Sequence, residues 1–104
     1  MARLIWTEPA IADLEAIADY IALDNPAAAC RLVKRVLESV ERLERFPTSG
    51  KRPPELSRSP YREVVVTPCR VFYRVESDTV FLLYVMRVER LLRRFLLDER
   101  NRTR

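Results

Sequence analysis

The first half of the chain places its apolar residues at helical spacing. A first apolar stripe recurs at steps of three and four residues and is formed by Ile11, Leu14, Ile17, Ala18 and Ile21. Thr7 stands before this stripe as an N-cap, so the pattern predicts a helix over residues 8–23. The short apolar run "RLIW", Arg3–Trp6, comes before the cap and predicts an N-terminal strand.

A second helix is predicted to begin at Pro26, because Asn25 is a good N-cap and proline is favoured in the first helical turn. Its apolar stripe is formed by Ala29, Leu32, Val33, Val36, Leu37, Val40, Leu43 and Phe46. Pro47 ends this helix, since proline cannot continue the backbone hydrogen bonding. Two long helices with a short link predict an antiparallel helical hairpin.

From Tyr61 onward the apolar residues change from helical spacing to alternation. Three runs rich in β-branched and aromatic residues follow, with the sequences "YREVVVT", "RVFYRVE" and "TVFLLYVMR". The connectors "PC" and "SD" are short enough for hairpins, so the runs predict a three-stranded antiparallel meander. The third run is apolar on both faces, which predicts a central strand covered by the helical hairpin on one face and by another element on the other.

Two remaining segments complete a single domain over residues 1–104. "TSGKRPPELSRSP" contains the only glycine and lies where the apolar period changes, which indicates a connector between hairpin and sheet. The basic C-terminal segment, residues 88–104, regains helical spacing, so we expect a short basic helix that ends near Asp98, with "ERNRTR" frayed. The predicted fold class is therefore α+β, with a short N-terminal strand, a helical hairpin, a meander and a short C-terminal helix.

The composition excludes several kinds of chemistry. The chain of 104 residues has no histidine, two cysteines and one glycine. Ser–His and Cys–His catalytic pairs are therefore excluded within this chain, and one glycine is too few for the glycine-rich nucleotide-binding motifs. We expect no metal and no cofactor. No apolar run is long enough to span a bilayer and no signal peptide is recognisable, so we expect a cytoplasmic protein with free thiols.

The formal net charge of +4 is spread unevenly. Residues 1–24 carry one arginine and five acids, whereas residues 87–104 carry seven arginines and three acids. This C-terminal excess suggests an anionic partner at that end. An ordinary solvated surface with a basic tail explains the charge equally well.

Several motifs are spread over about residues 4–87. They are "WTEPAIADLEAIADYI" at the start, "NPAAACRLVKRV" and "LERFPTSGKRPPEL" in and after the second helix, and "YREVVVTPCRVFYRVESDTVFLLYVMR" in the sheet. In this order they resemble the RelE/ParE superfamily of toxins from bacterial type II toxin–antitoxin systems. The form of the helical hairpin resembles ParE members more than RelE members, whose helices are typically shorter and more basic.

The resemblance implies a partner and two alternative activities. The partner is a cognate, ParD-like antitoxin that forms a hetero-oligomer with the toxin and masks basic residues. ParE-type members poison DNA gyrase without a catalytic centre, whereas RelE-type members cut mRNA in the ribosome. We favour a ParE-like gyrase poison over a ribosome-dependent endoribonuclease, which makes enzymatic activity the less expected outcome. A non-toxic binding module of the same fold is the third alternative.

The resemblance and the charge pattern suggest three groups of residues. For a ribonuclease, which needs an acid, a base and cations on the phosphate, the candidates are Arg62, Glu63, Arg70 and Tyr84. This set is thin, because arginine is a poor acid or base and the late tyrosine of ribonuclease members is missing. The candidate target contacts are Lys51, Arg52, Arg87, Arg90, Arg93 and Arg94. The candidate antitoxin contacts are Leu14, Ile21, Val33, Leu37, Arg62, Arg70 and Arg74.

Overall fold

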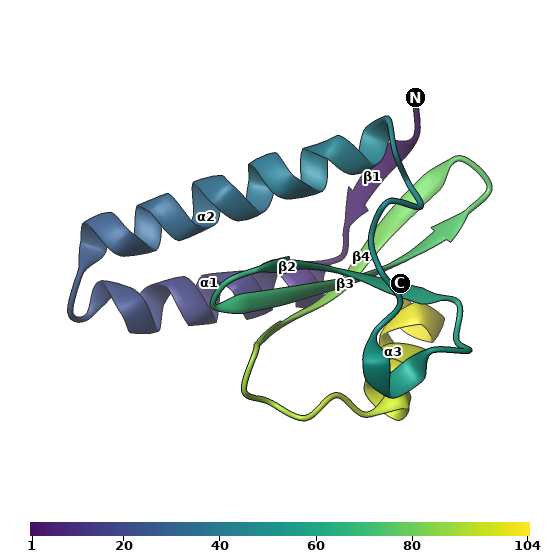
Figure 1. Ribbon diagram of the computed structural model, residues 1–104. Coiled ribbons are helices and arrows are strands. Elements are labelled where there is room, and N and C mark those ends of the chain that lie inside the picture. The colour runs from purple at the N-terminus through teal and green to yellow at the C-terminus, as the bar shows by residue number, and fades with distance from the viewer.

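The structure is a computed structural model that describes residues 1–104. Its strands are β1 (Arg3–Trp6), β2 (Tyr61–Val66), β3 (Cys69–Glu76) and β4 (Thr79–Arg87). Its helices are α1 (Glu8–Ala22), α2 (Pro26–Glu41) and α3 (Arg94–Thr103), with single 3-10 turns at Arg42–Glu44 (η1) and Pro54–Leu56 (η2). The predicted α+β architecture is confirmed, including the helical hairpin and the C-terminal helix (Figure 1).

The two long helices begin at the predicted caps. The Thr7 hydroxyl accepts a hydrogen bond from the Ala10 amide at 3.4 Å, and the Asn25 side chain accepts one from the Ala28 amide at 3.1 Å. Each bond satisfies an amide that has no partner inside the helix. Thr7 also donates from its hydroxyl to the Leu82 carbonyl at 2.8 Å, which fixes the start of α1 to the central strand.

The four strands form one sheet in the order β1-β4-β3-β2. The meander is antiparallel, as predicted, and β1 joins it by parallel pairing with β4. The register between β3 and β4 shifts between Phe72 and Tyr73, which lie opposite Tyr84 and Leu82. Strand β4 therefore carries one extra residue at Leu83, and its alternation between the two faces changes there.

Each face of the sheet has its own apolar core, as the doubly apolar β4 predicted. The helices α1 and α2 cover one face, and α3 lies against the other (Figure 1). The second core consists of Tyr61, Phe72, Leu83, Met86, Leu92 and Leu97. Both cysteines are free thiols, as predicted. None of the helices combines the length and the apolar character needed to cross a membrane.

The bounds predicted for the C-terminal helix were wrong. Residues 88–93 form turns and extended backbone, and α3 begins at Arg94 and continues past Asp98 to Thr103. The apolar spacing in this region reflects burial of Leu92 against the sheet and not a helical turn. The last turns, expected to be frayed, are held by distant partners, because Arg100 bonds Asp13 and Arg104 pairs with Glu76.

Candidate functional site

A buried arginine on β3 is the most highly connected charge in the molecule. Arg70 donates from Nε and Nη2 to the two carboxylate oxygens of Glu63 at 3.0 and 2.9 Å. Its Nη1 and Nη2 atoms donate to the Glu55 carboxylate, both at 2.8 Å. The guanidinium also lies over the Phe72 ring, 4.9 Å from its centroid. Arg70 retains only 8% of its exposed surface and Glu63 only 2%.

This cluster has more negative than positive charge. The hydrogen bonds that Arg70 donates to Glu55 and Glu63 raise the pKa of Arg70, and the bonds that Glu55 accepts from Arg70 lower the pKa of Glu55. Two ionised carboxylates against one guanidinium repel a phosphate group. Four of the five N–H bonds of Arg70 are already directed at carboxylate oxygens. The arrangement therefore suits a structural ion pair and not the stabilisation of a cleaving phosphodiester.

The other proposed ribonuclease residues lie apart from this pair. Arg62 lies opposite Tyr73 in the register and donates to the Gly50 carbonyl at 2.8 Å. The Arg100 guanidinium stacks on the Tyr84 ring, and its Cζ atom lies 3.9 Å from the ring centroid. The structure thus brings together Arg70 and Glu63 but neither Arg62 nor Tyr84. Sequence reasoning missed Glu55, which belongs to the irregular connector and gives no periodic signal.

The connector between hairpin and sheet runs along β2. Lys51 pairs with Glu63 through two backbone hydrogen bonds, of 3.1 and 2.7 Å. The Gly50 amide donates to the Tyr73 hydroxyl at 2.9 Å, and that hydroxyl donates to the Pro47 carbonyl at 2.8 Å. A Cβ atom at Gly50 would lie 2.4 Å from the Tyr73 oxygen, so only glycine fits here. Arg52 is tied to the Ser59 carbonyl, and the Lys51 side chain is exposed.

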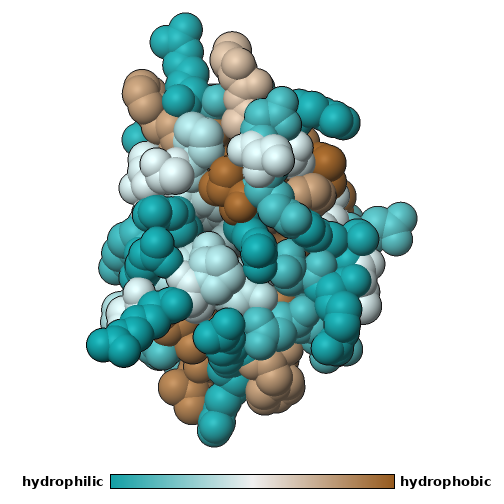
Figure 2. Space-filling model, turned by 90° about the vertical axis from the view of Figure 1, so that its right-hand side faces the viewer, coloured by the Kyte–Doolittle hydropathy of each residue, from teal (hydrophilic) through white to brown (hydrophobic).

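The C-terminal arginines differ in how strongly they are paired. Arg87 bonds Glu89 at 2.6 Å and Arg94 lies 3.4 Å from Asp98. Arg90 and Arg93 are exposed and have no ion pair. Figure 2 views the end of the molecule opposite the α1–α2 loop, where hydrophilic side chains predominate and hydrophobic residues form separate groups. Among the C-terminal arginines proposed as target contacts, Arg90 and Arg93 are therefore the most available to an anionic partner.

An apolar groove runs between α1 and α2. Two adjoining hollows of about 610 and 360 Å³ make up this hairpin groove and share Ala18, Asp19, Val33 and Leu37. Leu14 also lines the groove, whereas Ile21 packs against the core beneath. Three of the proposed antitoxin contacts therefore lie together. Of the three arginines in that group, Arg70 is buried, Arg62 lies on β2, and the Arg74 Nε atom is buried without a partner.

The fold and these surfaces define a small α+β protein of the RelE/ParE-like class, with an open groove on its helical hairpin. The model of the family described as ParE toxin of type II toxin–antitoxin system, parDE, matches residues 4–92. The chain therefore belongs to the ParE toxin family, and it is the toxin component of a type II toxin–antitoxin system.

Two relatives agree with this assignment. The chain is 36% identical to Toxin RelE2 of Caulobacter vibrioides over 92 residues, which cover 88% of this chain and 100% of the relative. It is also similar in structure to a chain of the chromosomal ParDE TA system from P. aeruginosa, with a TM-score of 0.71 and 30% identity. That match covers 86% of this chain and 98% of the other. The predicted superfamily is thus confirmed.

Proposed function

We propose that this toxin poisons DNA gyrase in the cytoplasm and is neutralised by a ParD-like antitoxin that occupies the hairpin groove. The main support is the state of Arg70, the clearest candidate for a ribonuclease residue. Its guanidinium is bound by Glu55 and Glu63 and buried between them. A toxin that acts by binding needs no free cation there, whereas RNA cleavage needs one on the phosphate.

The groove supports the antitoxin part of the proposal. Leu37 keeps 47% of its surface exposed on α2, and Val33 lies beside it in the groove. A monomeric protein gains stability by covering such residues, so their alignment in one groove is typical of a surface that binds an amphipathic helix. The antitoxin is the expected partner because the neighbouring solved structure is a ParDE system.

The C-terminal arginines support the target part. Arg90 and Arg93 extend from the loop between β4 and α3 without an acidic partner. We assign them the contact with gyrase or with the DNA that gyrase holds. Deletion of residues 88–104 is a poor test of this assignment, because Leu92 and Leu97 belong to the second core. Substitution of the exposed arginines tests it without removing that core.

The deciding experiment induces the toxin alone in cells and follows two readouts over the same minutes. Trapped gyrase–DNA cleavage complexes with protein synthesis still intact support the proposal. Early translation arrest with mRNA cut in ribosomes would instead assign the RelE-like ribonuclease activity, and unimpaired growth would assign a non-toxic binding module. The Arg90→Ala, Arg93→Ala double variant is expected to lose toxicity. The matched control is Arg45→Ala, Arg58→Ala, at two exposed arginines outside the C-terminal segment.

A further inference from the structure

The rim of the hairpin groove is acidic, although the chain as a whole is basic. The charged residues that line the two hollows are Glu15, Asp19, Glu38, Glu41 and Lys34. Four acids against one lysine give the groove a net charge of −3 within a chain of +4, so the remaining residues carry +7. The single lysine is also paired, because Lys34 Nζ lies 3.9 Å from Glu38.

We propose that the groove selects a helical antitoxin segment whose apolar anchors are flanked by lysine or arginine. This inference rests on the proposed function for the identity of the partner and adds the chemistry by which the partner is recognised. It reverses the expectation, implied by the family resemblance, that the antitoxin masks basic residues. At this surface the complementary partner is positive.

The dimensions of the groove fit a short helix. On α1 the lining residues extend from Ile11 to Ala22, a length of about 17 Å at about 1.5 Å per residue, which accommodates about three helical turns. Small side chains at Ala18, Ala22 and Ala29 let a helix backbone approach closely. Leu37 and Val33 offer apolar contact on the α2 side.

The apolar stripes of the two helices are wider than the internal core requires. On α1 the core takes Ala10 and Ile17, Leu14 contacts both the core and the groove, and Ile11 and Ala18 line the groove. On α2 the core takes Leu32, Val36 and Val40, whereas Leu37 lines the groove and Val33 lies between the core and the groove. The acids lie beside these groove-lining residues, so a bound helix would meet apolar contacts and negative charge together.

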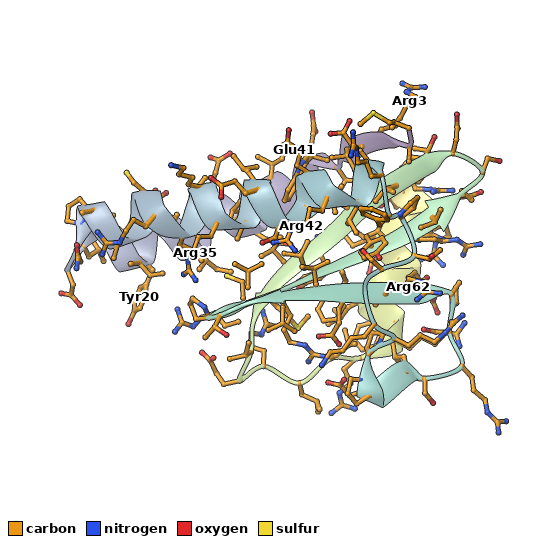
Figure 3. All side chains as sticks on the ribbon, turned by 45° about the horizontal axis from the view of Figure 1, so that its top comes forward. Arg3, Tyr20, Arg35, Glu41, Arg42 and Arg62 are labelled. Atoms are coloured by element: carbon orange, nitrogen blue, oxygen red, sulfur yellow. The ribbon has the colours of Figure 1, made fainter.

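The basic residues of α2 mostly face another direction. Arg35 and Glu41 leave opposite sides of α2 in Figure 3, and Arg35 donates to the Thr67 carbonyl at the β2–β3 turn. Arg31 and Arg35 line a separate polar hollow on the neighbouring face. Lys34 and Glu38 lie between the two surfaces and line both. The groove itself therefore presents its acids to an occupant.

Two synthetic peptides of about three helical turns would test the preference on the full-length toxin. Both carry leucine at the same anchor positions, and one has lysine where the other has glutamate on the flanks. We expect the lysine peptide to bind at least about tenfold more tightly at low salt, with a smaller difference at high salt because exposed charges are screened. Equal or tighter binding of the glutamate peptide would overturn the inference, as would failure of both peptides to bind.

Charge reversal in the toxin provides the matched test. The Asp19→Lys, Glu41→Lys variant is expected to abolish or reverse the preference for the lysine peptide. Glu99→Lys, at an exposed acid of α3 outside the groove, is expected to leave it unchanged. Thermal unfolding of each variant checks that the fold is retained. Because these measurements involve neither gyrase nor toxicity, a failed gyrase assay and a failed charge preference are separate outcomes.

Discussion

Arg70 and Glu63 join neighbouring strands through a two-point ion pair, with Nε–Oε1 and Nη2–Oε2 distances of 3.0 and 2.9 Å. The pair lies on the face of the sheet that α3 covers, and Glu55 adds a second carboxylate from the connector. A bidentate geometry of this kind is specific to arginine. It makes a charged cluster part of the structural support of the sheet.

Replacing Arg70 with methionine is expected to destabilise the fold by about 3–5 kcal/mol, because Glu63 would remain buried without a counter-charge. Urea unfolding measures this loss. Arg45→Met, at an exposed arginine without an ion pair, should change the free energy of unfolding by less than about 0.5 kcal/mol. An Arg70→Met variant as stable as the control would show that the ion pair adds no stability.

The ion pair of Glu55 makes part of the free energy of unfolding depend on pH in the acidic range. The pKa of Glu55 is lowered in the folded state by the hydrogen bonds from Arg70, so folding favours the ionised carboxylate. That contribution is present above the unfolded pKa of about 4.3 and is lost as the pH falls through the lower folded value. In Glu55→Gln we therefore expect a shallower decrease of stability below about pH 4.3. Midpoints of urea unfolding across this range measure the slope, and an unchanged slope would contradict the assignment.

Tyr61 makes folding stability fall as the pH rises in the alkaline range. Burial, followed by the 2.5 Å hydrogen bond to Asp98, raises the pKa of Tyr61 to about 12. The neutral phenol therefore adds stability below about pH 10, and this is lost as the pH rises through the folded value. Tyr61→Phe should lose less stability between about pH 10 and 12 than the unmodified chain does. Tyr20→Phe, at an exposed tyrosine, should keep the original slope.

Gly50 is expected to tolerate no side chain. A methyl group there would lie 2.7 Å from the Tyr73 ring and 2.8 Å from the Glu63 carbonyl, and the carbonyl belongs to the sheet backbone. Gly50→Ala should destabilise the protein by about 1–3 kcal/mol through this overpacking. Restored stability in Gly50→Ala, Tyr73→Phe would identify the hydroxyl contact as the main cause. A stable single variant would contradict the steric account.

The sequence predicted those features that depend on local chemistry. Thr7 and Asn25 marked both helix starts, and the two apolar faces of β4 predicted a covering element on each side. It did not predict the Arg70–Glu55 contact, because the two residues are fifteen positions apart and one belongs to an irregular segment. The start of α3 was missed for a related reason, since apolar spacing does not distinguish burial of Leu92 in a loop from burial in a helix.

The apolar stripe of α2 contains both core residues and groove residues, and the sequence pattern does not distinguish the two kinds. Val36 and Val40 fill the core, whereas Val33 and Leu37 line the groove, yet all four share the same helical spacing. A stripe that packs against the core and also lines a groove is wider than one that only packs against the core. The position of the sheet is needed to tell which of its residues face the core. The sequence therefore placed Val33 and Leu37 on one helical stripe but gave no sign of the groove that they line.

Leu37→Asp offers the sharpest test of the hairpin groove. Leu37 is already half exposed, so the substitution should cost the free toxin little stability. In the proposed complex the new carboxylate would be buried among apolar side chains and beside Glu38 and Glu41, so binding of the cognate antitoxin should weaken by about 30-fold or more. Titration calorimetry measures the affinity. Leu91→Asp, at a more exposed leucine outside the groove, should bind normally, and unchanged binding by Leu37→Asp would place the antitoxin elsewhere.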